Sequence, residues 1–178
     1  MRKILVAVDL QNDFIEGSLT VPGAASVIPV INASKHEYDM VYFTADWHST
    51  AHCSFKEQGG PWPVHCVHHT VGAAIPDSVI KDMDEGKMRV FHKGHLVEQY
   101  GAFAGLDPAD QDWFCPGDEV TVCGIACEYC VLETLKNIQA LAEAVKFKVR
   151  LWLSATAKFE SYKPILDFAR EHGLEVID

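Results

Sequence analysis

Cys130 is the residue whose type and position most directly suggest nucleophilic chemistry. It follows an apolar, β-branched run at residues 120–123 and a glycine at position 124, and helical spacing continues beyond it to about Val145. The pattern predicts a thiol near a helix N-terminus, just past the carboxyl end of a buried strand. Unpaired N–H groups and the helix dipole at such a position stabilise the thiolate, which is the nucleophilic form of cysteine.

A carboxylate and a lysine stand in comparable positions elsewhere in the chain. Asp9 closes the apolar run at residues 3–8, and Lys93 directly follows the run at residues 88–92. Acyl transfer through a thiol needs a nearby base, so Asp9 is a candidate proton carrier. A cation between a carboxylate and a thiol lowers the pKa of both, and this is the role expected of Lys93. Taken singly, Asp9 is also typical of a turn cap, and Lys93 of a surface charge.

A third group of residues has the chemistry of a metal site. Asp46 and His48 are separated by one residue at the end of an apolar run, and His65 follows later in the same long segment. On an extended backbone, this spacing places the side chains of residues 46 and 48 on the same side. One carboxylate and two imidazoles form a ligand set for a divalent transition metal. His52 is a candidate for a supporting role and Glu57 for an additional ligand.

Four aromatic residues are candidates to line an apolar slot for a flat substrate, because small-molecule sites are largely apolar clefts. They are Phe14, Trp62, Tyr100 and Phe103. Trp62 belongs to the segment 46–72, which shows no clear periodicity. So long a loop within a compact domain is usually functional. Taken singly, each of the four aromatic residues is more typical of a hydrophobic core.

The elements that must position these residues alternate between strands and helices. Apolar runs predict strands at residues 3–8, 40–45, 88–92, 119–123, 149–153 and 174–177. Helical spacing predicts helices at residues 24–33, 78–84 and 162–171, and in the stretch that follows Cys130. Such alternation indicates an α/β fold, a doubly wound and mainly parallel sheet with helices on both faces. Without repeats or a second pattern, residues 1–178 are expected to form a single domain.

The carboxyl ends of parallel strands meet at one edge of the sheet, where ligands bind in folds of this class. Asp9, Asp46, Lys93 and Cys130 fall at or just after the ends of the first four predicted strands. The topology therefore predicts that these four side chains converge. This convergence of separate elements is a stronger indication of a site than any single motif.

Composition excludes several other classes of protein. The chain has 178 residues, 48% of them hydrophobic, which excludes a disordered chain. The net charge is −10 without any basic cluster, so a nucleic-acid partner is not expected. No apolar run is long enough to span a membrane, and Asp9 and Asp13 interrupt the apolar start, which argues against a secretory signal. We expect a cytoplasmic protein without a disulfide framework.

Six runs, taken together, resemble the nicotinamidases of the isochorismatase-like cysteine hydrolase family. They are VDLQNDF at residues 8–14, TADWH at 44–48, WPVHCV at 62–67, HKG at 92–94, YGAF at 100–103 and GIACEYCV at 124–131. They occur in the family's order and spacing and cover nearly the whole chain. The set is highly specific, although each run alone would be weak.

The resemblance implies a Rossmann-like three-layer fold with a six-stranded sheet. It implies a catalytic triad of Asp9, Lys93 and Cys130. It implies a divalent metal ion, zinc in preference to iron or manganese, at Asp46, His48 and His65. The implied activity is hydrolysis of nicotinamide, and of pyrazinamide, to the acid and ammonia through a thioester on Cys130, in pyridine-nucleotide salvage and NAD metabolism. The metal would take the pyridine nitrogen of this small-molecule amide substrate.

Further details of the site are also implied by the resemblance. A non-proline cis peptide bond is implied between Ile125 and Ala126. An oxyanion hole is implied from the backbone N–H groups of Ala126 and Cys130. Of the four aromatic candidates chosen from the sequence itself, Phe14, Trp62 and Tyr100 are the expected substrate-binding side chains. A homo-oligomer is compatible with the family.

The chain also departs from the family's pattern. Cys127 stands where a small or polar residue such as threonine is usual, and a disulfide between Cys127 and Cys130 would block the nucleophile. The run 154–156, expected after the fifth strand, lacks the acidic residue that many relatives have there. Two alternatives stay open. One is a sister hydrolase acting on a ureido, carbamoyl or maleamate-type amide, and the other is a Cys-x-x-Cys thiol–disulfide oxidoreductase.

Overall fold

The computed structural model describes residues 1–110 and 112–178. Its strands form one sheet in the order β3-β2-β1-β4-β5-β6, and every neighbouring pair is parallel. The strands are β1 (Lys3–Val8), β2 (Met40–Asp46), β3 (Met88–Lys93), β4 (Glu119–Gly124), β5 (Lys148–Thr156) and β6 (Glu175–Ile177). The order runs outward in both directions from β1 and β4. This is the doubly wound α/β arrangement that the alternation of elements predicts.

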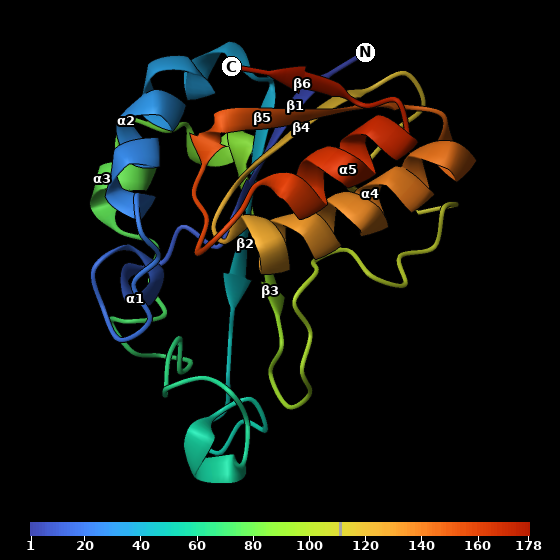
Figure 1. Ribbon diagram of the computed structural model, residues 1–178. Coiled ribbons are helices and arrows are strands. Elements are labelled where there is room, and N and C mark those ends of the chain that lie inside the picture. The colour runs from blue at the N-terminus through green and yellow to red at the C-terminus, as the bar shows by residue number, and fades with distance from the viewer. Residues whose placement is uncertain (111) are drawn as a thin grey trace.

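Helices cover both faces of this sheet (Figure 1). They are α1 (Asn12–Ile15), α2 (Ala24–Ser34), α3 (Asp77–Ile80), α4 (Leu132–Val145) and α5 (Lys163–Glu171). Helices α2 and α3 lie on one side, and α4 and α5 lie together on the other. Short 3-10 turns occur at Lys35–Glu37, Lys56–Gln58 and Glu85–Lys87, and a single turn of π-helix at Cys127–Val131. None of the helices in the described ranges has both the length and the apolar character needed to cross a bilayer.

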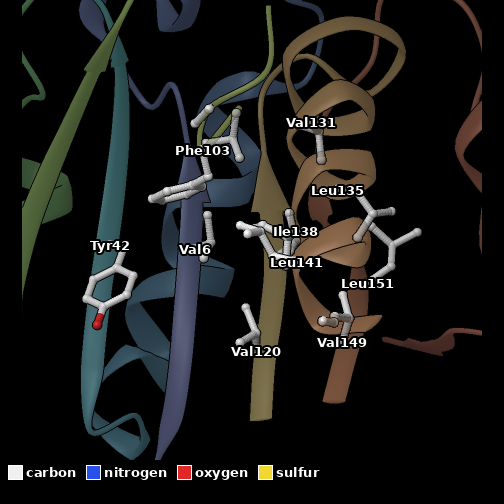
Figure 2. Packing of buried hydrophobic residues seen from close by; sticks show 14 of the residues in the cluster. Val6, Tyr42, Phe103, Val120, Val131, Leu135, Ile138, Leu141, Val149 and Leu151 are labelled. Carbon is white, nitrogen blue, oxygen red and sulfur yellow. The ribbon is translucent and has the colours of Figure 1, made fainter. Parts of the chain in front are cut away.

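Two hydrophobic clusters, one on each face of the sheet, hold the layers together. Alternate residues of a strand point to opposite faces, so Val6 of β1 packs in one cluster and Leu5 in the other. The first cluster joins the sheet to the apolar stripe of α4, including Leu135 and Ile138 (Figure 2). The second joins the sheet to α2 through residues such as Ile31. The helical spacing seen in the sequence thus corresponds to the buried faces of these helices.

The structure corrects the predicted bounds of several helices and strands, and it shows how exposed β3 is. Strand β3 is an edge strand with its middle residues largely exposed, and Lys93 is its last residue rather than the residue after it. The helix expected at residues 78–84 ends at Ile80, and α1 was not predicted. Strand β5 continues to Thr156, which places the run 154–156 inside the strand rather than after it. Edge exposure and strand length depend on neighbouring segments, which local periodicity does not report.

Replacing Gly124 by alanine is expected to destabilise the protein strongly. Gly124 ends β4 with a φ of +121°, and a Cβ there would lie 2.2 Å from the carbonyl oxygen of Val8. The clashing atoms are backbone atoms of β1, which cannot move without disrupting the central pair of strands. We expect the free energy of unfolding to fall by at least about 3 kcal/mol through combined overpacking and backbone strain. Urea unfolding followed by circular dichroism measures this change.

Gly105→Ala is the matched control for this variant. Gly105 also has a positive φ, +71°, but a Cβ there would meet no atom within 4 Å. Its expected cost is about 1–2 kcal/mol, from backbone conformation alone. Equal losses of stability in the two variants would contradict the steric explanation.

Candidate active site

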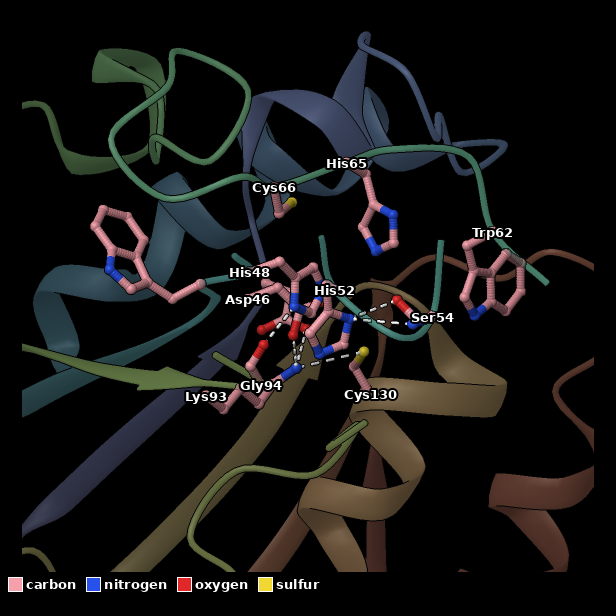
Figure 3. Close-up of polar contacts among 12 residues, drawn as sticks. Asp46, His48, His52, Ser54, Trp62, His65, Cys66, Lys93, Gly94 and Cys130 are labelled. Carbon is pink, nitrogen blue, oxygen red and sulfur yellow. Dashed lines mark hydrogen bonds and ion pairs between the residues drawn. The ribbon is translucent and has the colours of Figure 1, made fainter. Parts of the chain in front are cut away.

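Four side chains from the ends of four strands meet at the carboxyl edge of the sheet. Asp9 follows β1, Asp46 ends β2, Lys93 ends β3 and Cys130 follows β4. The Nζ atom of Lys93 lies 2.8 Å from Asp9 Oδ2, 2.5 Å from Asp46 Oδ1 and 3.6 Å from Cys130 Sγ. Figure 3 shows the last two contacts converging on the lysine. The structure therefore brings together the four residues that the strand ends single out.

Lys93 is buried and forms ion pairs with two carboxylates. Burial by itself lowers the pKa of a lysine, but Asp46 and Asp9 outweigh it, and the pKa of Lys93 lies well above its usual value. Its shortest contact is with Asp46, a candidate metal ligand, rather than with Asp9. Lys93 therefore links the predicted triad to the predicted metal site through a direct ion pair with Asp46, whereas the sequence predicted only that the four side chains converge.

Asp9 is held in an unusual backbone conformation. Its φ is +49°, in the left-handed region that few residues other than glycine adopt. The Thr44 hydroxyl donates to Asp9 Oδ1 at 2.5 Å, and the Asp9 amide lies 3.2 Å from Thr44 Oγ1. Burial raises the pKa of the Asp9 carboxyl, and the charge of Lys93 opposes that rise only in part. A raised carboxyl pKa brings the group nearer to the range in which a proton carrier works.

Burial of Cys130 opposes the stabilisation of its thiolate that is expected at a helix N-terminus. Burial raises the pKa of its thiol well above the usual value, Lys93 lowers it, and the carboxylates of Asp9 and Asp46 raise it again. The raised pKa favours the thiol form of Cys130, which would need a base to act as a nucleophile. Carboxylate oxygens of Asp9 and Asp46 lie within 4.8 Å of Cys130 Sγ. Proton transfer from the thiol to Asp9 is thus a short-range step.

The position of Cys130 depends on a π-helical turn, not on the first turn of an α-helix. Cys130 is the fourth residue of Cys127–Val131, and the Val131 amide donates to the Ala126 carbonyl at 3.1 Å. The peptide bond between Ile125 and Ala126 is cis, as the resemblance implies. Ala126 and Cys130 both line an apolar cavity, which is described below. Single π-helical turns of this kind occur frequently at functional sites.

Three buried residues form a compact donor set beside the lysine. One ligand atom each of Asp46, His48 and His65 lies within 4.8 Å of the other two. The Nδ1 atoms of His48 and His65 lie 2.5 and 2.7 Å from the carbonyls of Gly94 and Pro63. Because a carbonyl only accepts, each Nδ1 carries a proton, which leaves each Nε2 free to bind a metal. Two imidazoles and a carboxylate fit a divalent ion such as zinc.

The charges of the site also fit a cation. Burial raises the pKa of the Asp46 carboxyl, but Lys93 and His48 outweigh it, so the pKa lies well below its usual range and the group is ionised. Burial lowers the pKa of His65, which keeps the ring neutral, as a ligand must be. Asp9 and Asp46 share a single lysine, and a divalent ion on Asp46 would offset the remaining negative charge.

His52 and Glu57, the two further candidates, take no place in the donor set. His52 stacks on His48, with ring centroids 4.0 Å apart. Its Nδ1 lies 2.8 Å from the Ser54 hydroxyl and its Nε2 lies 3.1 Å from the Val97 carbonyl, so both nitrogens are engaged. Glu57 is exposed in the 3-10 turn Lys56–Gln58. His52 thus supports the ring of His48, and Glu57 stays in solvent.

The sequence interpretation missed two residues that hold the site in place. The side chain of Gln11 forms two hydrogen bonds with the backbone of Asp46, at 2.8 Å each. The Asp13 carboxylate accepts the Cys66 amide at 2.7 Å and so fixes the segment that carries His65. Both residues lie within the run at 8–14. Polar residues directly behind a buried strand were the signal that would have identified them.

His65→Ala is expected to lose the metal ion. The variant keeps Asp46 and His48 but removes one of three donors, and incomplete sets bind far more weakly. We expect less than about 0.1 metal ion per chain after purification and a rise in KM. Losing only a hydrogen-bond partner of a ligand already costs about 10–100-fold in metal affinity, and losing the ligand itself should cost more. Elemental analysis of the purified variant measures this. Retention of one ion per chain would contradict the assignment of His65.

An apolar cavity opens onto Cys130 and the donor set. Its walls are Phe14, Leu19, Asp46, Trp62, His65, Tyr100, Ala126, Tyr129, Cys130 and Phe159. Phe14, Trp62 and Tyr100 therefore line it. Phe103 does not, since it is buried in the core against Phe91, at 4.7 Å between ring centroids, and its prediction as a slot residue was wrong. Leu19, Tyr129 and Phe159 were missed, because nothing local distinguishes them from core residues.

The thiols of Cys127 and Cys130 are both free. Burial raises the pKa of Cys127 to about 12. Redox-active cysteine pairs of this spacing have lowered thiol pKa values and partial exposure, whereas both thiols here are buried. These properties argue against the thiol–disulfide oxidoreductase alternative.

The chain is similar to known proteins over its whole length. The model of the isochorismatase domain matches residues 3–141. The nicotinamidase/pyrazinamidase of Mycobacterium tuberculosis is 31% identical, over 98% of this chain and 98% of that protein.

Solved structures show the same relationship. A pyrazinamidase of Pyrococcus horikoshii in complex with zinc superimposes with a TM-score of 0.81 at 30% identity, covering 100% of this chain and 99% of that one. The protein PnC1 from L. infantum, in complex with nicotinate, has a TM-score of 0.83 at 28% identity, covering 99% of this chain and 92% of that one. Domain match, sequence identity and fold agree, and the chain belongs to the isochorismatase family.

Proposed function

We propose that the protein is a metal-dependent cysteine amidohydrolase that converts nicotinamide to nicotinate and ammonia, and that also accepts pyrazinamide. The observation that carries the proposal is the position of Lys93 Nζ, in contact with Asp9, Asp46 and Cys130. One buried cation thereby connects a base, a nucleophile and a metal-type donor set at the end of an aromatic cavity. Relatives named nicotinamidase/pyrazinamidase support the choice of substrate.

The first half of the reaction forms a thioester. Asp9 accepts the thiol proton of Cys130 as the sulfur attacks the carboxamide carbon. Backbone N–H groups of Ala126 and Cys130 donate to the oxyanion that develops on the amide oxygen. Asp9 then returns the proton to the amide nitrogen, the C–N bond breaks, and ammonia leaves. Lys93 keeps the Asp9 carboxylate ionised and close to the sulfur.

The second half releases the acid. Asp9, ionised again, takes a proton from a water molecule that attacks the thioester carbon. The C–S bond breaks, and the proton returns to sulfur to restore the thiol. The same carboxylate thus serves twice as a base and twice as an acid. Repeated proton transfer by Asp9 is consistent with the raised pKa of its carboxyl, which burial causes.

The cavity orients the substrate ring relative to the sulfur. The ring of Phe14 lies 5.5 Å from that of His65, so an aromatic wall adjoins the donor set. Asp46, His48 and His65 would hold the metal ion, and we infer zinc because two imidazoles and one carboxylate form a common catalytic zinc set. When bound, the ion would supply a Lewis-acid position for the ring nitrogen meta to the carboxamide, which nicotinamide and pyrazinamide share.

Ammonia release by the metal-loaded protein tests this proposal. Nicotinamide and pyrazinamide are compared with maleamate and an N-carbamoyl amino acid, the substrate types of sister hydrolases. We expect turnover of the two ring amides with a kcat/KM at least about 100-fold above the acyclic compounds, since the cavity is built from aromatic side chains. The reverse preference would favour a sister hydrolase. No turnover of any of the four would reject the proposal.

A further inference from the structure

Glu128 lies two residues before Cys130 in the π-helical turn, and the proposed chemistry does not use its side chain. Its carboxylate instead accepts three backbone N–H groups from a single loop. Phe159 N lies 3.1 Å from Oε2, and Glu160 N and Ser161 N lie 2.6 and 2.7 Å from Oε1. Partial burial raises the pKa of this carboxyl, but the N–H groups outweigh it and the pKa is lowered. The anchor is therefore an ionised, charge-assisted one.

The anchored loop carries one wall of the substrate cavity. The Phe159 ring lines the cavity together with Cys130. It stacks on Trp62, with centroids 6.0 Å apart and an interplanar angle of 19°, and meets Tyr129 edge-on at 6.1 Å. A displaced Phe159 would therefore remove an aromatic surface from the mouth of the site.

Besides the Phe159 ring contacts and a hydrogen bond within the loop, from Lys158 Nζ to the Glu160 carbonyl at 3.1 Å, the loop has further attachments at its two ends. Ala157 exchanges backbone hydrogen bonds with Gly124 and Cys127, at 3.0 and 2.8 Å. At the other end, the Tyr162 hydroxyl donates to the Thr156 carbonyl at 2.8 Å. Between them, the amides of residues 159–161 are satisfied by the Glu128 carboxylate. Without that carboxylate, the three adjacent N–H groups could bond only to water. The middle of the loop would then be released from the π-helical turn.

We propose that Glu128 is a positioning residue, which ties the loop bearing Phe159 to the π-helical turn bearing Cys130 and so fixes the width of the substrate cavity. One side chain, that of Glu128, then fixes the position of the Phe159 ring relative to Cys130. The proposal rests on the proposed amide hydrolysis for its kinetic consequence. Its structural consequence can be measured without turnover.

Amide hydrogen exchange measures the structural consequence in Glu128→Ala. We expect exchange in the peptide that spans residues 159–161 to accelerate at least about tenfold, as charge-assisted hydrogen bonds are lost. Glu160→Ala is the matched control. It removes an exposed carboxylate from the same loop but keeps the backbone N–H that Glu128 accepts. Exchange in this control is expected to match the parent protein.

Alkylation of Cys130 gives a second readout that is independent of turnover. Iodoacetamide is small, whereas N-benzylmaleimide carries a ring that must pass the Phe159 wall. The ratio of the benzylmaleimide rate to the iodoacetamide rate, read at Cys130 by peptide mass spectrometry, should rise at least about fivefold in Glu128→Ala. Phe159→Ala should show the same rise, because it removes the wall directly.

Kinetics with nicotinamide test the effect on the substrate. We expect Glu128→Ala to raise KM at least about tenfold and to lower kcat less than about threefold, the pattern of lost substrate binding. Glu128→Gln keeps one acceptor oxygen and should fall between the parent and the alanine variant. Glu160→Ala should retain parent values.

The outcomes separate this proposal from the proposed function. Unchanged exchange at residues 159–161 in Glu128→Ala would overturn the anchoring role, whatever the activity. Faster exchange with an unchanged alkylation ratio would overturn the claim that the anchor shapes the cavity. If the parent protein hydrolyses no amide, the proposed function fails, while faster exchange and a raised alkylation ratio still support the positioning role.

Discussion

Cys130→Ala is expected to abolish amide hydrolysis and leave the protein folded. Alanine removes the only thiol that lies in contact with Lys93 and within reach of the Asp9 carboxylate, among the residues that the structure describes. Loss of a covalent nucleophile costs on the order of 10⁶-fold in kcat in the best-studied hydrolases. The smaller side chain fits a space already lined by buried residues, so the secondary structure should be retained. Ammonia release and far-UV circular dichroism measure the two effects.

Cys127→Ser is the matched control for the nucleophile. Cys127 lies in the same π-helical turn and is also buried, but unlike Cys130 it does not line the cavity. We expect this variant to retain at least about a third of the parent kcat, with some loss of stability from placing a hydroxyl in an apolar site. An inactive Cys127→Ser beside an active Cys130→Ala would reverse the assignment of the nucleophile.

Lys93→Ala and Lys93→Arg are both expected to lower kcat/KM by more than about 100-fold, the scale on which positioned charged groups act. Alanine leaves the buried carboxylates of Asp9 and Asp46 without their shared cation. Arginine keeps the charge but is longer and planar, and it cannot place a single donor at both contacts in a fully buried site. Steady-state hydrolysis of nicotinamide measures the loss.

The sign of the accompanying pKa change follows from the contacts. Lys93 lowers the pKa of the Cys130 thiol, whereas burial and the two carboxylates raise it. Removing the cation therefore raises the thiol pKa further, and the pH profile of iodoacetamide alkylation at Cys130 should move to higher pH in Lys93→Ala. An unchanged profile with near-normal turnover would reduce Lys93 to a structural residue and leave Asp9 and Cys130 as the reacting pair. Circular dichroism separates both results from unfolding.

A metal measurement on the same variants separates the two roles of Lys93. Its ammonium contacts Asp46 at 2.5 Å, so it competes with a metal ion for that carboxylate. Lys93→Ala should therefore retain the metal ion that His65→Ala loses. Loss of activity with full metal content would assign the effect to the reacting groups rather than to an empty donor set.

The sequence itself determined the strands, their order along the chain and the residues at their ends. Apolar runs locate β1, β2 and β4 to within a residue of their observed bounds, because burial on both faces of a parallel sheet leaves a continuous apolar signature. Since parallel strands end at one edge, this was enough to place Asp9, Asp46, Lys93 and Cys130 near one another. The two histidines of the donor set followed from residue type and spacing.

Only the tertiary structure decided the environments of these residues. The thiol pKa of Cys130 depends on how deeply it is buried and on two carboxylates that come from other strands. The close pairing of Lys93 with Asp46 depends on the register between β2 and β3. The roles of Phe103 in the core and Phe159 in the cavity depend on segments distant in sequence. Local patterns report periodicity, whereas desolvation, charge pairing and cavity walls arise from distances between remote segments.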